Sequence, residues 1–400
     1  MQKFLSYYFI KWALLCVVVG VLTGSAVAAF LLGLDEVVEM NNNASWLIYF
    51  LPLGGIIIGL FYFYYGKEVE KGNNLILEEI NENKQSIPFR MAPMVLLGTW
   101  LSHLFGASVG REGTAVQLGG AIADRFTIWF SLNHNDRKIL LLLGISAGFA
   151  AVFGTPLAGA IFALEIMALG NLRWKAFLPS ISVAYIAHFI CLQWKVEHTE
   201  YFIYYLPEMN TLNFTWTAFA GVLFGLCAYL FVTSGDIFKQ AFSFISFPPL
   251  RPFIGGTIVL AAIFLLDTNI YNSLGIQTIK NAFVQQQPLQ VFFIKLLLTA
   301  FTLSAGFKGG EVTPLFFMGA TLGSALILII PLPLDYLAAI GFVSVFAGAT
   351  NTPLACAVMG VELFGFDTGI FMIIACVSAY LSSGKKGIYA SQISTWNSSK

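Results

Sequence analysis

Long apolar stretches recur along the whole chain and are separated by short polar segments. The first two, residues 12–34 and 46–65, each run for about the 20 residues that a helix needs to cross a bilayer. The first stretch follows Lys3 and Lys11 and is too long for a signal peptide, so we expect a membrane helix with a cytoplasmic amino terminus. The pattern predicts an all-α, polytopic membrane protein.

Several later apolar stretches are short or interrupted. Three of them end at segments that place a proline where a new helix can start, namely 141–153 before Pro156, 296–307 before Pro314 and 342–349 before Pro353. We therefore predict broken half-helices that meet near the middle of the membrane. Irregular backbone at that depth requires protein or a wet cavity to satisfy its polar groups.

The chain also contains a weak internal repeat. Residues 155–166 (TPLAGAIFALEI) match residues 352–363 (TPLACAVMGVEL). Residues 110–121 (GREGTAVQLGGA) align with residues 309–320 (GGEVTPLFFMGA), and this alignment superimposes the two glutamates of these blocks. Because both pairs of blocks occur in the same order, about half the chain apart, we infer a duplication.

Repeated halves, often of inverted topology, are a common transporter architecture. We place the first transmembrane repeat at residues 1–205 and the second at 206–400, with the polar segment 194–213 at the seam. Apolar segments run to about residue 382, so we expect no cytoplasmic regulatory domain.

Composition agrees with this class and excludes others. The chain is 58% apolar and only 10% charged, whereas soluble domains carry about 25% charged residues. Its 21 basic and 21 acidic residues give a net charge of zero, which gives no reason to expect a nucleic acid partner. The five cysteines and four histidines lack metal-ligand spacing, so we expect buried free thiols, no metal and no cofactor.

Glycines precede four predicted helix starts, after Gly72, Gly110, Gly309–Gly310 and Gly384–Gly387. A helix amino terminus presents unpaired N–H groups and a partial positive charge, and glycine lets the backbone approach an ion closely. Several such ends converging inside the membrane can bind an anion without a cluster of basic side chains.

Glu112 lies between two glycines and follows Arg111, in a chain that otherwise avoids charge. An ionisable group at membrane depth is a candidate functional residue. An ionised carboxylate can occupy an anion site, whereas a protonated one is neutral and can leave it. We therefore predict that Glu112 is a gate and a proton carrier; a buried structural pair with Arg111 is the alternative.

Three ordered blocks resemble the CLC family of chloride channels and anion/proton antiporters. They are GREGT (110–114), SAGFAAVFGTPLAGAIFALE (146–165) and GFKGGEVTP (306–314). The resemblance implies an all-helical protomer of two inverted repeats, a homodimer, and one ion pathway in each subunit.

Departures from the family pattern indicate which branch of the family, and which anion, to expect. GNNLI (72–76) stands where members selective for chloride or nitrate carry GSGIP, and Glu311 and Val312 replace apolar residues of the third block. Ile166 follows Glu165 where many chloride/proton antiporters have a second glutamate, so the inner proton-transfer acid is missing. This combination is similar to the fluoride/proton antiporter branch of the family.

The resemblance implies two proton-handling glutamates, Glu112 and Glu311. It also implies a set of anion-binding residues: Asn73, Gly110, Arg111, Gly113, Val312, Thr313 and Tyr389. The amide, hydroxyl and phenol groups of this set are hydrogen-bond donors, which suit fluoride because it is small and strongly hydrated.

Each of these assignments has a structural alternative. The alternatives are a structural acid stabilised by Lys308 for Glu311, helix capping for Asn73 and Thr313, and an interfacial position for Tyr389. Glu165 and Glu362 occupy equivalent repeat positions, and we interpret both as helix-end acids that bond to neighbouring backbone.

The residues by themselves indicate an anion transporter, and the resemblance implies a proton-coupled fluoride exporter in the lipid bilayer of the cell membrane, with fluoride and protons as its ions. A chloride-handling antiporter or channel of the same family is the second possibility. A membrane-embedded enzyme would need a nucleophile with a base or a paired metal site, and the sequence offers neither, so we expect a transporter.

Overall fold

The computed structural model describes residues 2–167 and 172–392, and in this part of the chain the secondary structure is helical. Its elements are α1 (Gln2–Asn43), η1 (Ser45–Phe50), α2 (Leu51–Tyr65), η2 (Lys67–Val69), α3 (Asn73–Glu82), α4 (Met91–Leu104), α5 (Glu112–Trp129), α6 (His134–Phe153), α7 (Pro156–Glu165), α8 (Leu172–Gln193), α9 (Thr211–Ser243), α10 (Leu250–Leu266), α11 (Ile276–Ala282), α12 (Gln290–Ala305), α13 (Val312–Ala325), η3 (Leu326–Leu328), α14 (Leu334–Thr350), α15 (Pro353–Phe364), η4 (Phe366–Thr368) and α16 (Gly369–Ser382). The predicted all-α class is confirmed.

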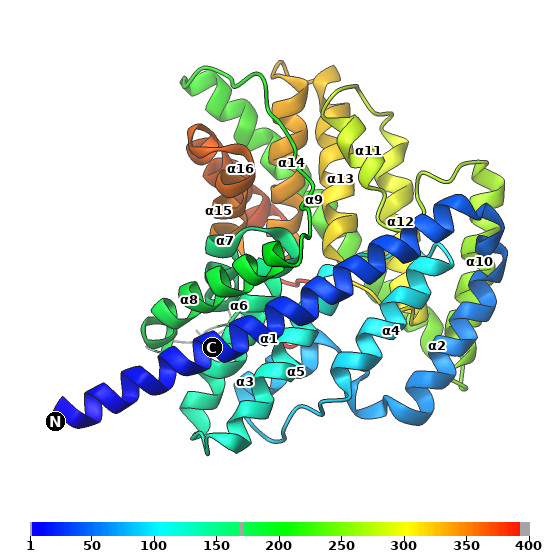
Figure 1. The fold of residues 1–400 in the computed structure, drawn as a ribbon. Helices are drawn as coiled ribbons and strands as arrows, with labels where there is room; N and C mark the ends of the chain where they lie inside the picture. Colours follow the sequence, from blue (N-terminus) through cyan, green and yellow to red (C-terminus); the bar gives the residue numbers. More distant parts are fainter. Residues whose placement is uncertain (1, 168–171, 393–400) are drawn as a thin grey trace.

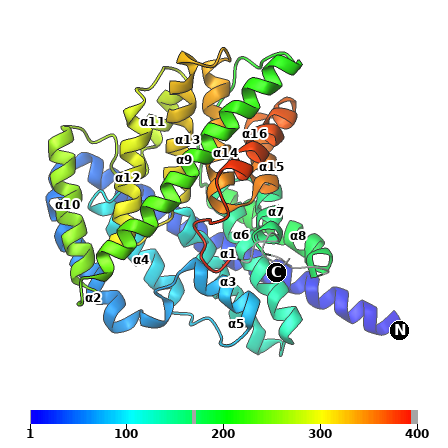
Figure 2. The ribbon, with the colours of Figure 1, turned by 180° about the vertical axis from the view of Figure 1, so that it is seen from behind.

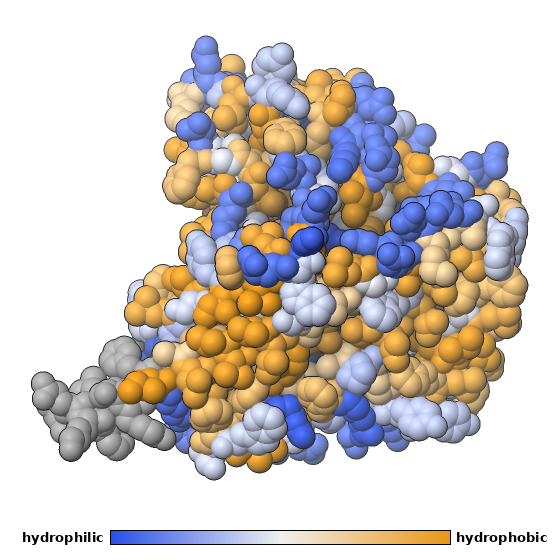
Figure 3. Space-filling model, in the orientation of Figure 1, coloured by the Kyte–Doolittle hydropathy of each residue, from blue (hydrophilic) through white to orange (hydrophobic). Residues whose placement is uncertain are grey.

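Four helical segments in the described residues are long and apolar enough to cross a membrane. They are Ile10–Asn43, Ser45–Tyr65, Trp174–Gln193 and Thr211–Ser243. The remaining apolar helices are shorter, as expected for broken spans. Figure 3 shows broad hydrophobic areas on one face of the molecule, with hydrophilic residues gathered above and along the lower edge. The protein is a multi-pass membrane protein.

In Figure 1, α1 crosses the front of the molecule with α13 and α14 above it, and several of the shorter helices pack backbone against backbone. A Cβ added at Gly119 of α5 would lie 2.0 Å from the carbonyl oxygen of Gly144 of α6. A Cβ at Gly319 of α13 would lie at the same distance from the carbonyl oxygen of Gly341 of α14. Small residues permit such close helix contacts in membranes, where dispersion replaces the hydrophobic effect as the driving force. The α5–α6 and α13–α14 pairs therefore use the same packing.

Two glutamates form reciprocal caps between α7 and α15. The Glu165 carboxylate, at the end of α7, accepts the backbone N–H groups of the α15 residues Leu354 and Ala355, at 3.0 and 2.7 Å. The Glu362 carboxylate, near the end of α15, accepts those of Leu157 and Ala158 of α7, at 2.9 and 2.7 Å. The predicted role of both acids is confirmed, because each satisfies the unpaired donors of the opposite helix start.

Most predicted helix starts are correct. The helices α3 and α5 begin just after Gly72 and Gly110, and Pro156 and Pro353 open α7 and α15. Pro314 is a small exception, because α13 begins two residues earlier, at Val312. A proline in the first turn loses no intrahelical bond there, since the first N–H groups have no partner in the helix.

The helix predicted after Gly384–Gly387 is wrong. Residues 384–392 have no helix and instead run along the back of the molecule towards α3, as Figure 2 shows. The backbone N–H of Ile388 donates to the carbonyl oxygen of Ala349 at 2.8 Å. That of Ser391 donates to the Asn74 side-chain oxygen at 3.0 Å. Contacts with distant residues thus hold this segment in a non-helical path, and such contacts cannot be read from the local sequence.

The five cysteines are free and buried, which confirms the sequence interpretation. The predicted seam also has a counterpart in the structure, because an irregular segment joins α8 to α9 between residues 194 and 210. The α5–α6 pair before this segment and the α13–α14 pair after it pack in the same way, which supports two repeats. The repeat boundary itself stays a prediction.

Candidate functional site

The starts of α5 and α13 are joined by a short antiparallel bridge. The backbone N–H of Gly110 donates to the carbonyl oxygen of Gly310 at 2.6 Å, and that of Gly310 donates back to Gly110 at 2.7 Å. A Cβ at Gly110 would lie 2.9 Å from three atoms, including a side-chain oxygen of Glu112. Glycine is therefore required here, because the two chains and the carboxylate leave no room for a side chain.

Glu112 is the first residue of α5, and only 3% of it is exposed. Its Oε2 atom accepts the backbone N–H of Arg111 at 3.1 Å and that of Thr313 at 3.0 Å. The Thr313 hydroxyl donates to Oε1. The carboxylate thus occupies donors that belong to the starts of two helices from opposite halves of the chain, which is an arrangement that suits an anion.

Arg111, Gly113 and Val312 surround this carboxylate. The Nε atom of Arg111 lies 3.8 Å from Oε1 of Glu112, a distance too long for a direct hydrogen bond. A Cβ at Gly113 would lie 3.1 Å from the amide nitrogen of Asn73 and 3.2 Å from Cα of Gly310. Val312 is buried as the first residue of α13. The structure therefore brings most of the sequence-predicted site residues together.

Asn73 and Tyr389 also lie near this site, and neither occupies the position that its structural alternative requires. Gly72, not Asn73, is the N-cap of α3, and no side-chain cap bond forms there. The Asn73 side-chain oxygen is buried without a hydrogen-bond partner. Tyr389 is buried within the protein, with 6% exposed, rather than lying at a membrane interface. Thr313 does not cap its helix either, because the N-cap of α13 is Glu311 and its own hydroxyl bonds Glu112.

Three cavities adjoin these residues. The first, of about 140 Å³ and here called the Lys308 cavity, has Asn73, Lys308, Glu311 and Tyr389 in its wall. The second, of about 40 Å³ and here called the Thr313 cavity, is lined by Arg111, Glu112, His198, Thr199 and Thr313, among others. A third, of about 10 Å³ and here called the Phe162 pocket, shares Asn73 and Tyr389 with the first. The first and third cavities thus meet at Asn73 and Tyr389, and the second adjoins Glu112.

Glu311 faces a different cavity from Glu112. It lines the Lys308 cavity, whereas Glu112 lines the Thr313 cavity. Among the described residues no ion pair within 4.0 Å joins Glu311 to Lys308, so the predicted stabilisation by that lysine is not a direct contact. The two glutamates therefore line separate cavities.

Comparisons with known proteins agree with this geometry. A family model described as voltage gated chloride channel matches residues 54–384. A chloride/fluoride channel protein of Pseudomonas syringae pv. tomato is 47% identical over 395 residues, which cover 96% of this chain and 87% of the relative. The chain belongs to the CLC family.

Solved structures of this family show the same fold. The crystal structure of a CLC-type fluoride/proton antiporter superimposes with a TM-score of 0.93 at 35% identity, covering 96% of this chain and 98% of that one. A slow cyanobacterial Cl⁻/H⁺ antiporter superimposes with a TM-score of 0.81 at 20% identity, covering 95% and 96% of the two chains, which supports the fold alone.

A cluster of phenylalanines beside the CLC site escaped individual prediction. The ring centroids of Phe149 and Phe162 are 4.5 Å apart, and Phe346 lies 6.3 and 6.0 Å from these two. Phe162 also lines the Phe162 pocket. The repeat alignment carried a signal, because it places Phe149 on Phe346, but the many other phenylalanines of the chain obscured it.

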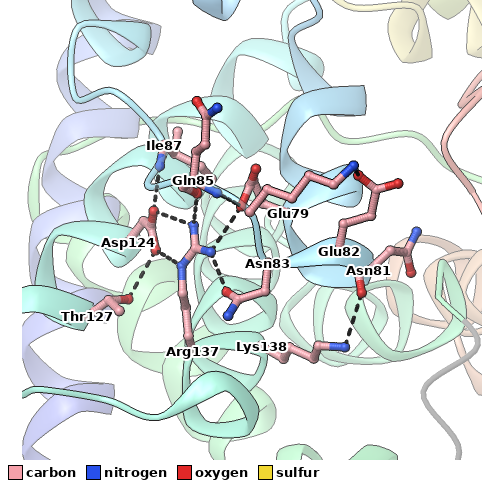
Figure 4. A network of polar contacts seen from close by, with 11 residues as sticks. Glu79, Asn81, Glu82, Asn83, Gln85, Ile87, Asp124, Thr127, Arg137 and Lys138 are labelled. Carbon is pink, nitrogen blue, oxygen red and sulfur yellow. Dashed lines mark hydrogen bonds and ion pairs between the residues drawn. The ribbon is translucent and has the colours of Figure 1, made fainter.

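A buried ionic network fixes the helices that carry the site (Figure 4). Arg137 of α6 donates to Asp124 of α5 at 2.7 and 2.8 Å and to Glu79 of α3 at 3.0 Å. It also donates to the carbonyl oxygen of Gln85 at 2.7 Å and to the Asn83 side chain. Breaking such a network is costly because it leaves a buried charge unpaired. The network therefore holds α3 and α5 together, away from the ends that bear the site residues.

Proposed function

We propose that this protein exports fluoride from the cytoplasm in exchange for protons. The observation that carries the proposal is the position of the Glu112 carboxylate, which occupies backbone and hydroxyl donors that an anion would otherwise use. Two similar proteins support the choice of ion, since one is named a chloride/fluoride channel protein and the other a fluoride/proton antiporter.

The sides of the membrane follow from the first two spans. With the amino terminus in the cytoplasm, α1 leads outward and η1 with α2 leads back, so that residues 66–72 return to the cytoplasmic side. The Lys308 cavity includes residues 69–74 in its wall, so in this proposed orientation it faces the cytoplasm. The Thr313 cavity is lined by residues of the segment between α8 and α9, at the opposite end of the path.

The proposed cycle alternates two occupants of one site. With Glu112 ionised, its carboxylate holds the N–H groups of Arg111 and Thr313 and the Thr313 hydroxyl. Protonation from outside removes the charge and frees these donors for an anion that arrives from the Lys308 cavity. Strong hydrogen-bond donors favour fluoride, because fluoride loses the most hydration free energy of the halides when it leaves water and the donors replace part of that loss. Glu311 passes the proton to the cytoplasm from its own cavity.

The donors of this site are the reason to prefer transport of an anion over membrane-embedded catalysis. These donors are a backbone N–H and the hydroxyl of Thr313, and both bond the charged carboxylate of Glu112. Such a set can stabilise a bound anion without any group that attacks a substrate bond. We further propose that the protein works as a homodimer in the cell membrane of its host, as the family resemblance implies.

The test is ion flux in proteoliposomes. Fluoride efflux is followed with an ion-selective electrode, and internal pH with a dye, under a proton gradient and without one. Coupled export predicts proton influx that stops when fluoride is absent from the lumen. Faster efflux of chloride than of fluoride would favour the chloride-handling alternative, and anion efflux without proton movement would favour a channel.

A further inference from the structure

Lys308 is a cation in the cavity wall that the proposed cycle leaves without a role. It lies in the turn between α12 and α13, where its backbone N–H donates to the Ser102 hydroxyl at 3.2 Å. Its ammonium nitrogen lies 4.0 Å from the centroid of the Tyr62 ring. Because the face of an aromatic ring attracts a cation, the side chain is held against one wall of the Lys308 cavity.

No acid neutralises this ammonium directly. Within residues 10–167 and 174–392, no carboxylate oxygen lies within 4.0 Å of the Lys308 nitrogen. Other lysines differ, since Lys71 pairs with Glu78 at 2.7 Å and the buried Lys295 donates to two carbonyl oxygens at 2.9 and 2.8 Å. An ammonium has three donors and no acceptor, so Lys308 can take a further ligand.

The cavity around Lys308 limits both the size and the position of a ligand. Its wall also carries Glu70, Lys71 and Glu311, so its charged side chains comprise two acids and two bases. Among the described residues, Lys71 is engaged by Glu78, whereas Lys308, Glu70 and Glu311 have no ion pair within 4.0 Å, so an anion bound here must lie on the Lys308 side of the cavity. The cavity holds about 140 Å³, and about 10–15 Å³ suffices for one water, so a partly hydrated ion fits.

We propose that Lys308 forms a recruitment site for a small inorganic anion, which it binds in the Lys308 cavity before the anion reaches Asn73 and Tyr389. The ammonium replaces part of the hydration shell that the ion loses on entry. A compact, strongly hydrated cation suits a compact anion, and fluoride is the one that the proposed function supplies. This inference rests on that function and adds to it the place where the transported ion first meets the protein.

The test compares Lys308→Gln with Lys308→Arg and with Lys71→Gln. Lys71 is the matched control, because it lines the same cavity but its ammonium is paired and its side chain is 62% exposed. Fluoride efflux is measured against luminal fluoride at several ionic strengths. We expect Lys308→Gln to raise KM roughly tenfold with kcat changed less than about threefold, because a binding interaction common to ground and transition states is lost. Both other variants should keep the KM of the wild type.

Loss of the charge should also weaken the dependence of KM on ionic strength. An unchanged KM in Lys308→Gln would overturn the proposal, and so would an equal loss of kcat in Lys308→Gln and Lys308→Arg, since that marks a structural role. If Lys308→Gln does not fold, Lys308→Met replaces it, with the same expectation. If the wild type transports chloride and not fluoride, the proposed function fails, while the same KM comparison made with chloride still decides the role of Lys308.

Discussion

The starts of α5 and α13 resemble each other in sequence and backbone but differ in what their glutamates do. Both follow a glycine of the Gly110–Gly310 bridge, and the repeat alignment superimposes Glu112 on Glu311. Yet Glu112 is the first residue of its helix and bonds the opposite helix start, whereas Glu311 is the N-cap of α13 and lines the Lys308 cavity.

A shift of one position relative to the helix start therefore separates the two acids. Successive residues at a helix start point in different directions, so a one-residue offset turns a side chain from one side of the bridge to the other. Duplication provided two similar helix starts, and this offset gives each carboxylate its own cavity. The following changes test the difference, from the largest expected effect to the smallest.

Glu112→Gln should abolish coupled proton movement, with proton influx reduced roughly 100-fold or more. The amide cannot take up or release the proton, although it can still accept hydrogen bonds from the α13 start. Proton influx in proteoliposomes measures the effect. Glu39→Gln, at an exposed position of α1 outside the site, is the control, and proton influx at the wild-type rate in Glu112→Gln would refute the gate assignment.

Glu311→Gln should reduce proton influx by about tenfold while fluoride efflux continues. The reason is that only one of the two proton-handling positions is lost, on the side that faces the Lys308 cavity. The ratio of protons to fluoride ions, measured in the same vesicles, reports the change. A ratio identical to that of the wild type would mean that Glu311 is a structural acid and that the two helix starts differ only in shape.

Thr313→Val should weaken fluoride binding during transport, so that the KM for fluoride efflux rises roughly tenfold. The change removes the hydroxyl that donates to Glu112, and a hydrogen bond to a charged group contributes about 1.5–3 kcal/mol. Thr313→Ser keeps the hydroxyl and is the matched control. Equal KM values for the two variants would show that the hydroxyl contributes nothing and that the backbone N–H groups suffice.

Glu165→Gln and Glu362→Gln should each lower stability by about 1–3 kcal/mol, without a change in coupling ratio. Each removes the charge that caps the opposite helix start, and the two caps have the same geometry to within about 0.1 Å. Thermal unfolding in detergent should show nearly equal falls in melting temperature. Clearly unequal falls would mean that the two caps of the α7–α15 pair contribute differently to stability.

Much of the candidate site could be predicted from local sequence. Glycine before an apolar run marks a helix start, and an acid placed there stands out in a chain that avoids charge, which identified Glu112. The repeat alignment identified the paired acids Glu165 and Glu362, whose caps the structure confirms.

Other features had no local signal. The tail that carries Tyr389 was predicted to be helical, but its bonds to Ala349 and Asn74 hold it in a non-helical path. The structure places Glu112 and Glu311 in the walls of different cavities. The repeat alignment did not predict this difference, because it treated the two glutamates as equivalent. Both depend on residues that are far apart in the chain.

The sequence by itself determined that this chain enters a bilayer as helices and where most of those helices begin. These properties follow from side-chain hydrophobicity and from the backbone chemistry of glycine and proline, which act over a few residues. Only the tertiary structure decided that Thr313 reaches Glu112, that Tyr389 lies buried in the same cavity walls as Asn73, and that no carboxylate of the described residues lies within 4.0 Å of the Lys308 ammonium. Those contacts join residues from different helices, and their formation depends on how the whole set of helices packs.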